Sequence, residues 1–478
     1  MIGPIRQPAV RNPRFTTALV FFVPFVVSSV CLAAAPPQAR PIPLAQRVAD
    51  MAAKVQNGKG QVGISAVSLA DDKPIIAIDA SEPLIPASNQ KVLTSAVALA
   101  TLGGEYKFTT QVYQQDRDVV LVGDYDPTLG DPVLAAAAKQ DIYVELDKWA
   151  KAIKARMDKV ESVLVCVPPG RAYRNADWPA SQQTHWYAAP VAALDFNNNC
   201  FDVTFKVEKG VVEAAVSPAS RFIAVRNKVK AGKRDVWSLD TTEDSVVLTG
   251  SVIKSSSQPV SVAFNNPPMV LARVLADRMV RAGVEFGGKF GQVEKLAGGD
   301  PLLASTQTPL AAVMARANKR SLNMAAECIF LRCCGDWETG PAKATEILTK
   351  TYELPAEGFH IADGSGLSRK NTVSPAAMTK LLAALAKRKD AKVFIDSLPI
   401  AGVDGTLEKR MTAEPYKGRV LAKTGYIAGV SCLSGYVLDG DKRPAVAFSV
   451  MVNHIAGAGD AKALENGVAE ALVDSLTK

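Results

Sequence analysis

The sequence predicts an α/β protein of the α+β kind, in which helices pack against an antiparallel sheet and a large, mostly β insert interrupts the chain. Three observations support this prediction: helical periodicity near both ends, short alternating segments between residues 107 and 262, and two apolar strands near the C-terminus. With 478 residues, 48% of them hydrophobic, the chain is long enough for two or three domains.

The elements before the insert are a helix, a hairpin and a second helix. The pattern LAQRVADMAAKVQNGKG predicts a helix that ends at Gly58, and the alternating stretch after it predicts two strands that turn at Asp71-Asp72. An apolar helix then begins after Pro86 and ends at Gly103-Gly104, a residue pair typical of a helix C-terminus.

Residues 105–267 are assigned to the inserted β-rich part, because their apolar segments are short and broken by turn residues. Helical periodicity returns in NNPPMVLARVLADRMVRAG, where Asn266 is suited to cap the helix. We therefore expect the other domain to consist of residues 36–104 and 268–478, with the second boundary between 265 and 300.

The C-terminal part predicts further helices and the strands of the main sheet. Helical patterns occur in PLAAVMARAN, NMAAECIFLRCC and SPAAMTKLLAALAKR, and strand patterns in GRVLAKTGYIAG and VSCLSGYVLDGDKRPAVAFSVMVNH. The tail predicts a helix with one apolar face, formed by Leu464, Val468, Leu472 and Leu476. A sheet with a helix packed across it is the simplest arrangement of these elements.

The N-terminus predicts export. Residues 1–14 are basic and contain no acid, and the apolar run FTTALVFFVPFVVSSVCLAAA follows, so residues 1–35 have the pattern of a signal peptide. The run is also long enough to span a bilayer, which leaves an uncleaved anchor as the alternative. Either way, we expect a periplasmic or other extracytoplasmic location, with peripheral association with the membrane or cell wall.

Composition argues against nucleic-acid binding and metal chemistry. The formal charge of +8 is spread without long basic runs, which does not favour a nucleic-acid partner. The cysteines match no zinc spacing and the three histidines form no HExxH pair, so we expect no metal and no cofactor. A Ser-His triad is also weakly supported, because the sequence has only three histidines. Most cysteines after Cys31 are expected to be buried free thiols.

Ser88 and Lys91 lie three residues apart where the second helix begins. Ser at such a position is most often an N-cap, and Ser-x-x-Lys recurs at Ser251 and Ser475, so the motif alone is weak. In a helix, however, the two side chains share one face, and the Ser88 hydroxyl lies in the positive field of the helix N-terminus. The residues alone thus leave two readings of Ser88, a cap or a nucleophile.

A lysine can act as a base at neutral pH only if burial or a nearby cation lowers its pKa. Lys423, in the strand-like segment LAKTGYIAG, is the candidate second cation, and Gly425 beside it would let a substrate backbone approach closely. Ser321 and Asn323, just before a predicted helix, add a hydroxyl and an amide. Each motif also has a structural explanation, a strand end or a helix cap.

Taken together, Ser-x-x-Lys, Ser-x-Asn and Lys-Thr-Gly are the motif set of β-lactamases and penicillin-binding proteins. The chain resembles the D-alanyl-D-alanine carboxypeptidase/endopeptidases of the low-molecular-mass class C penicillin-binding proteins. The stretches that carry the resemblance include VLVGDYDPTLG, HWYAAPVAALDFNNNC, ADGSGLSRKNTVSP, LPIAGVDGTLEKR and AKTGYIAGVSCLSGYV. The resemblance implies a penicillin-recognising, serine transpeptidase/β-lactamase-like fold that carries inserted domains between Ser88 and Ser321.

The resemblance also implies a role for each motif residue. Ser88 would be the acylated nucleophile and Lys91 its base, while Ser321 relays a proton to the leaving amine and Asn323 orients the substrate amide. Lys423 would lower the pKa of Lys91 and, with Thr424, hold the substrate carboxylate, and the oxyanion hole would use the N–H groups of Ser88 and Tyr426. Arg369 is the remaining residue expected near the substrate. The sequence is equally compatible with a surface arginine in a Gly-rich turn that has no role in the site.

Two positions depart from the family pattern. Tyr426 follows Lys-Thr-Gly where Thr or Ser is common, and Leu322 occupies the middle of Ser-x-Asn where Asp or Asn is common. Neither change removes a required group, so they bear on substrate fit.

The function implied is that of a serine-type D-Ala-D-Ala carboxypeptidase, with cross-link cleavage by the same chemistry, acting on peptidoglycan peptides and acylated by β-lactams. A β-lactamase is the nearest alternative, but no Glu-x-x-Leu-Asn segment lies between Ser321 and Lys423. A non-catalytic wall-binding module is the second alternative. Against it, a structural protein has no evident need for two lysines in one site.

Overall fold

The computed structural model describes residues 43–477 except residues 169 and 243. The predicted signal peptide, residues 1–35, lies outside the described residues. Among the helices that are described, none combines the length and the apolar character needed to cross a membrane.

A five-stranded antiparallel sheet forms the centre of the fold, in the order β16-β17-β18-β1-β2. Its strands are β1 (Gln61–Ser68), β2 (Pro74–Ile78), β16 (Val420–Ile427), β17 (Val430–Leu438) and β18 (Pro444–Asn453). The predicted hairpin is confirmed, with Asp72 at φ 56° in its turn. Because β1 pairs with β18, the two ends of the chain build one sheet, and β16 lies at its edge.

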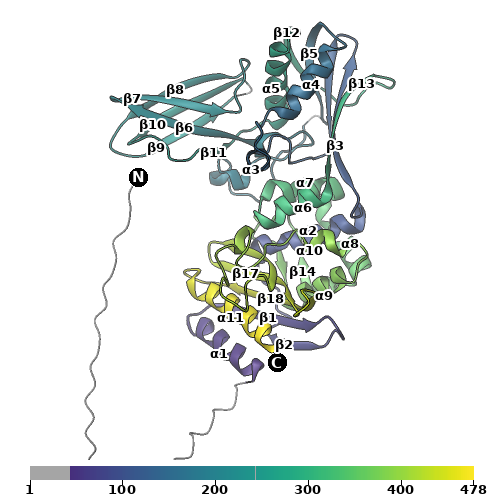
Figure 1. The fold of residues 1–478 in the computed structure, drawn as a ribbon, viewed down its shortest axis with the longest axis vertical. Coiled ribbons are helices and arrows are strands. Elements are labelled where there is room, and N and C mark those ends of the chain that lie inside the picture. Colours follow the sequence, from purple (N-terminus) through teal and green to yellow (C-terminus); the bar gives the residue numbers. More distant parts are fainter. Residues whose placement is uncertain (1–42, 169, 243, 478) are drawn as a thin grey trace, which may run out of the picture. The chain divides into compact units, whose positions relative to one another are not determined.

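Two helices, α1 (Leu44–Asn57) and α11 (Gly459–Ser475), pack together against one face of this sheet (Figure 1). Val48 and Ala52 of α1 join Leu464, Val468 and Leu472 of α11 in one buried cluster with residues of β17 and β18. The predicted apolar face of the tail helix is therefore confirmed for three of its four residues. Leu476 is the exception, since it follows the last helical residue and is 37% exposed.

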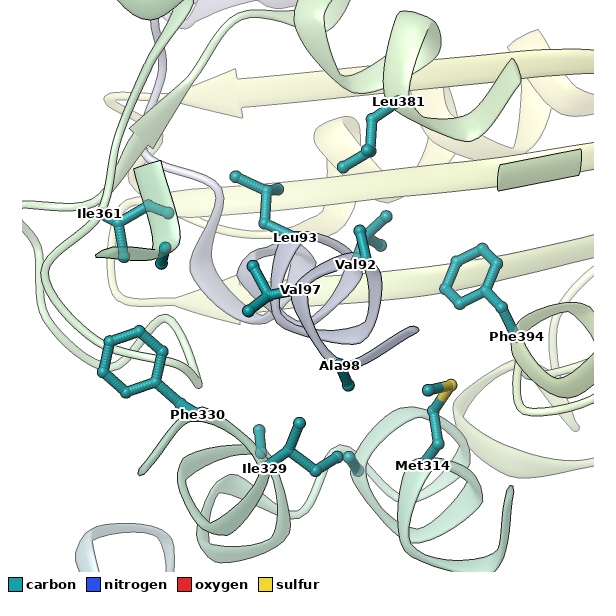
Figure 2. Close-up of a cluster of buried hydrophobic side chains, with 14 of the residues drawn as sticks. Val92, Leu93, Val97, Ala98, Met314, Ile329, Phe330, Ile361, Leu381 and Phe394 are labelled. Carbon is teal, nitrogen blue, oxygen red and sulfur yellow. The ribbon is translucent and has the colours of Figure 1, made fainter. Parts of the chain in front are cut away.

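The opposite face of the sheet is covered by helices that surround α2 (Gln90–Thr101) (Figure 2). Every residue of α2 from Gln90 to Leu99 is buried, as expected for a helix that is packed on all sides. Val97 and Ala98 lie among Met314, Ile329 and Phe330 of the neighbouring helices. The helices of this layer are α6 (Leu310–Lys319), α7 (Asn323–Cys334), α8 (Gly340–Tyr352), α9 (Pro375–Ala386) and α10 (Ala391–Ile395).

The insert contains three sheets. A mixed sheet has the order β12-β5-β4-β3-β13, and two three-stranded sheets have the orders β11-β6-β7 and β8-β10-β9. The strands are β3 (Lys107–Gln115), β4 (Asp118–Gly123), β5 (Lys159–Cys166), β6 (Cys200–Glu208), β7 (Val211–Ser217), β8 (Ala224–Ala231), β9 (Val236–Thr241), β10 (Ser245–Val252), β11 (Val260–Ala263), β12 (Glu285–Val293) and β13 (Leu302–Pro309). Outside the insert, β14 (Phe359–His360) and β15 (Thr372–Val373) form a short ladder.

The insert also contains helices that the sequence analysis did not predict, α3 (Pro132–Ala137) and α4 (Val144–Lys154). The second of these buries Leu146, Trp149 and Ile153 against the mixed sheet. The predicted helix that follows the insert is confirmed as α5 (Pro267–Arg281), and the Asn266 side chain accepts from the N–H of Met269 at its start.

The strand pairing bears on the second domain boundary, which we had expected near residue 268. Strand β12 pairs with β5 and β13 pairs with β3, while α5 shares a buried cluster with α4. Residues 267–309 thus pack with the insert. We propose that the insert ends near Pro309, the last residue of β13. The sequence did not predict this boundary, because these pairings are non-local and leave no trace in the local periodicity.

Candidate active site

Ser88 lies in the 3-10 turn η1 (Ala87–Asn89) that leads into α2. The turn is strained, since Ala87 has φ 45°, and it is tied to the sheet by a hydrogen bond from the Asn89 amide to Ser434 of β17 (2.7 Å). Ser88 makes no capping hydrogen bond to this turn or to α2. Instead its Oγ accepts a hydrogen bond from Lys91 Nζ at 2.9 Å, which removes the structural reason to read Ser88 as a cap.

Lys91 is buried, with 1% of its surface exposed, and its ammonium has three acceptors. These are Ser88 Oγ (2.9 Å), Asn323 Oδ1 (2.7 Å) and the Ser365 carbonyl (2.8 Å). Burial lowers the pKa of Lys91 to about 7, and the nearby carboxylates of Asp363 and Glu327 act in the opposite direction. The amine can therefore be free of its proton near neutral pH, as a general base must be.

Lys423 is the second buried lysine of the site, on the edge strand β16. Its Nζ donates to Ser321 Oγ (3.0 Å) and to the Thr424 carbonyl (2.7 Å). Burial and, second, the charge of Lys91 hold the pKa of Lys423 well below its ordinary value. We had expected Lys423 to be the cause of a low pKa at Lys91. Burial is the cause that lowers the pKa of Lys91, and the repulsion between the two amines is seen at Lys423.

The Ser-x-Asn motif connects the two lysines. Ser321, at φ 55°, accepts from Lys423, and Asn323, the first residue of α7, accepts from Lys91 through its carbonyl oxygen. The Asn323 amide nitrogen donates to the carbonyl of Tyr187 (2.8 Å), which lies in a turn of the insert. No side chain caps α7, so Ser321 does not act as a helix cap here.

Gly425 lies beside the Ser88 turn, and the reason for a glycine there differs from our expectation. A Cβ at this position would lie 2.5 Å from the Pro86 carbonyl oxygen and 3.2 Å from Asn89 Oδ1. The close neighbour is thus the turn that carries Ser88. Glycine allows β16 to reach that turn, whereas we had expected it to admit a substrate backbone.

The remaining predicted substrate residues lie on exposed or half-buried surface around β16. Thr424 Oγ1 donates to Thr406 Oγ1 (2.8 Å), and Tyr426, 57% exposed, has its ring beneath the ammonium of Lys462 on α11. Arg369 is exposed and donates to the carbonyl of Ala428, in the turn that follows β16. All the motif residues and Arg369 are therefore brought to one region of the fold.

The loop of residues 362–371, one of the stretches that carry the family resemblance, closes the buried side of this site. Asp363 accepts from the N–H groups of Gly366 (2.7 Å) and Ser368 (2.6 Å) and from Trp178 of the insert. Two carboxylates of this region, Asp363 and Glu327, were not among the predicted site residues. The latter could have been found, because an acid inside the apolar run AECIF, four residues after Asn323, has to face that same buried side.

The other Ser-x-x-Lys matches lie elsewhere. Ser251 is on β10 of the insert, where its hydroxyl donates to the Arg234 carbonyl, and Ser475 is the last residue of α11. The six cysteines of the described residues are free thiols. Within those residues no group of His, Cys, Asp or Glu is arranged to hold a metal ion.

Comparison with known proteins decides the family. The model of the D-Ala-D-Ala carboxypeptidase 3 (S13) family matches residues 44–474. The chain belongs to this family. It is a serine-type D-Ala-D-Ala carboxypeptidase, and hence a hydrolase, as the motif set implied.

Individual relatives agree with this assignment. The D-alanyl-D-alanine carboxypeptidase DacB of Haemophilus influenzae is 27% identical over 434 residues, which cover 85% of this chain and 88% of that protein. A D-alanyl-D-alanine carboxypeptidase of Actinomadura sp. is 27% identical over 452 residues, covering 83% and 78%. The crystal structure of penicillin binding protein 4 (dacB) from Haemophilus influenzae matches with a TM-score of 0.73 at 25% identity, over 89% of this chain and 99% of that one. The predicted penicillin-recognising fold is thereby confirmed.

Proposed function

We propose that Ser88 is the nucleophile of this carboxypeptidase and that Lys91 is its general base. The contact that carries the proposal is the 2.9 Å hydrogen bond between Ser88 Oγ and an amine that burial brings to a pKa of about 7. Ser88 Oγ attacks the carbonyl carbon of the penultimate D-Ala, and its proton passes to the free amine of Lys91.

The tetrahedral intermediate then needs an oxyanion hole and a proton for the leaving group. The N–H groups of Ser88 and Tyr426 are our candidates for the first. Ser321 relays a proton to the nitrogen of the terminal D-Ala, which leaves as a free amino acid. Water then attacks the Ser88 ester, so that the peptide leaves with a new carboxylate and Ser88 regains its proton.

Substrate orientation falls to the other residues of the site. Asn323 is held between Lys91 and the insert, which supports a role in orienting the substrate amide. Lys423 and Thr424 are proposed to hold the terminal carboxylate, with Arg369 near the stem peptide. The same chemistry accommodates cleavage of peptide cross-links, and β-lactams, which resemble D-Ala-D-Ala, are expected to acylate Ser88.

The test is the intact mass of the protein before and after benzylpenicillin, with the modified peptide located by fragmentation. We expect one adduct on Ser88, no adduct in Ser88→Ala, and an unchanged adduct in Ser251→Ala. The decay rate of the adduct separates a peptidase from a β-lactamase, which must hydrolyse the ester quickly. A folded protein that forms no adduct would favour the non-catalytic, wall-binding module.

We also propose that the exported protein associates peripherally with an anionic membrane surface through β8. The stretch RFIAVRNKVKAGKR, residues 221–234, holds six cations and no acid. Arg226, Lys228 and Lys230 alternate along β8 and so share one face of this edge strand, and all three are exposed. Such a row of cations is attracted to anionic lipid headgroups.

Cosedimentation with vesicles tests this association. Vesicles with anionic headgroups should retain the protein at low salt, and neutral vesicles should not. Lys228→Glu/Lys230→Glu should abolish retention, whereas the control Lys148→Glu, at an exposed lysine that is paired with Glu145, should not. Equal retention of both variants would leave the β8 cations with the ordinary role of protecting a sheet edge from aggregation.

A further inference from the structure

Glu327 is a fully buried carboxylate on α7 that the proposed reaction does not use. Its two oxygens accept three hydrogen bonds: Oε1 from the N–H of Ser365 (2.7 Å), and Oε2 from the N–H of Gly364 (3.1 Å) and Trp337 Nε1 (2.8 Å). A buried carboxylate with this many donors is strongly fixed in place.

The peptide that Glu327 holds is the one that contacts Lys91. The N–H of Ser365 donates to Glu327, while the carbonyl of the same residue accepts from Lys91 Nζ at 2.8 Å. The loop packs closely against α7 and the Ser88 turn at two glycines. A Cβ on Gly364 would lie 2.5 Å from Phe330 Cβ, and one on Gly366 would lie 1.8 Å from the carbonyl oxygen of Ala87.

The Ser365 carbonyl matters most when Lys91 is a free base. A neutral amine has two N–H groups and one lone pair, and the lone pair must face Ser88 Oγ to accept its proton. Of the three acceptors around Lys91, Asn323 Oδ1 and the Ser365 carbonyl remain for the two N–H groups. These two acceptors therefore fix the direction of the lone pair.

We propose that Glu327 is a positioning residue: its carboxylate fixes the Gly364–Ser365 segment, whose carbonyl directs the lone pair of Lys91 toward Ser88. The inference rests on the proposed role of Lys91 as the base. Glu327 does not touch the reacting atoms and acts only through Ser365 and through its charge.

Several charged groups face this arrangement. Glu327 faces Lys91 of α2 and Asp363 of the loop, and the thiol of Cys328 beside it faces Asp195 of the insert. Lys423 of β16 faces Lys91 from the other side. Burial and, second, the charge of Asp363 raise the pKa of Glu327 to about 7, so Glu327 gains its charge in the range in which Lys91 titrates. Where that charge is present, it raises the pKa of Lys91, against the effect of burial. Removing that charge should thus move the deprotonation of Lys91 to lower pH.

The experiment compares two substitutions of Glu327 with a matched control. In Glu327→Gln an amide nitrogen replaces one oxygen, so at least one of the three donors loses its acceptor and the charge is lost. Glu327→Asp keeps the charge but shortens the reach. The control is Glu465→Gln, which alters an equally buried carboxylate on α11, on the opposite face of the sheet.

Rates of acylation by a fluorescent penicillin are measured as a function of pH, together with the melting temperature. Glu327→Gln should slow acylation at least tenfold at the pH where the wild type reacts fastest, and should shift the rising limb of the profile to lower pH. Glu327→Asp should slow acylation and leave the limb in place. Glu465→Gln should lower the melting temperature only.

Three outcomes would overturn the proposal: a Glu327→Gln profile within twofold of the wild type with an unmoved limb, a fully active Glu327→Asp, or the same limb shift in Glu465→Gln. If Glu327→Gln does not fold, Trp337→Phe takes its place, because it removes one donor near the surface. Trp337→Phe should also shift the rising limb of the pH profile to lower pH, by less than Glu327→Gln does. An unmoved limb would again refute the proposal. Labelling of Ser88 in the wild-type protein tests the proposed function separately. If the wild type is labelled and the Glu327 predictions fail, the role of Glu327 is refuted and the proposed function stands.

Discussion

Substitution of Gly425 by alanine tests how closely the edge strand and the Ser88 turn must approach. The added Cβ would lie 2.5 Å from the Pro86 carbonyl oxygen, about 0.9 Å short of the 3.4 Å at which ordinary contact begins. Both partners are backbone, so no side chain can rotate away, and either β16 or the turn has to move by roughly that distance. A misplacement of about 1 Å in an active site can cost about 100-fold in rate, and we expect a loss of that order here.

The assay is the second-order rate constant for acylation by a fluorescent penicillin, measured beside the melting temperature. Overpacking of this kind costs about 1–3 kcal/mol, so Gly425→Ala should fold and be acylated about 100-fold more slowly. Gly440→Ala is the control, because a Cβ there, in the turn between β17 and β18, meets nothing within 4 Å. A folded Gly425→Ala that reacts within about threefold of the wild type would show that the separation of strand and turn is not critical.

Three further predictions concern the titratable groups. Since the pKa of Lys91 is about 7, the rate of acylation should rise as the pH increases through that value and then level off. A rate that does not change with pH would contradict this. Lys91→Arg, which stays protonated, should give no labelling. Lys423→Ala should slow acylation by peptides with a free terminal carboxylate more than by their amides, and equal effects on both would remove its anchoring role. Burial raises the pKa of Asp195 from 3.8 to about 7, so its ionisation destabilises the folded state. The effect is absent below pH 3.8 and is complete above a pH of about 7. The melting temperature of Asp195→Asn relative to the wild type should therefore increase as the pH rises between these values, and a difference independent of pH would contradict the assignment.

The parts of the fold that were predictable from sequence are those fixed by local signals. The cap at Asn266, the end of α2 before Gly103-Gly104 and the hairpin turn at Asp72 each depend on residues within one turn of the feature. The pairing of β12 with β5 and of β13 with β3 joins residues more than a hundred positions apart, and the periodicity of the strands does not contain it. Helix α4 was missed because its apolar residues lie within a block of strand-like segments.

The candidate site divides in the same way. The motif residues could be chosen from the sequence because the three motifs together match the set of β-lactamases and penicillin-binding proteins, although each motif alone also had a structural explanation. What the sequence could not supply is the part of the site that depends on contacts between distant segments. Glu327 reaches Lys91 only through Ser365, Gly425 is fixed by the Ser88 turn, and Tyr187 of the insert holds the far side of Asn323.

The two buried lysines bear on when the base becomes active. Burial lowers the pKa of both amines and the charge of Lys91 lowers that of Lys423 further, so the site holds one positive charge more easily than two. A substrate carboxylate bound at Lys423 would favour the charged form of that residue, and the restored charge would in turn push the proton off Lys91. The base would then be released when a substrate with a free terminal carboxylate arrives. On this view Lys423 contributes to the rate as well as to binding, which is why Lys423→Ala should lower both for carboxylate substrates more than for the amides.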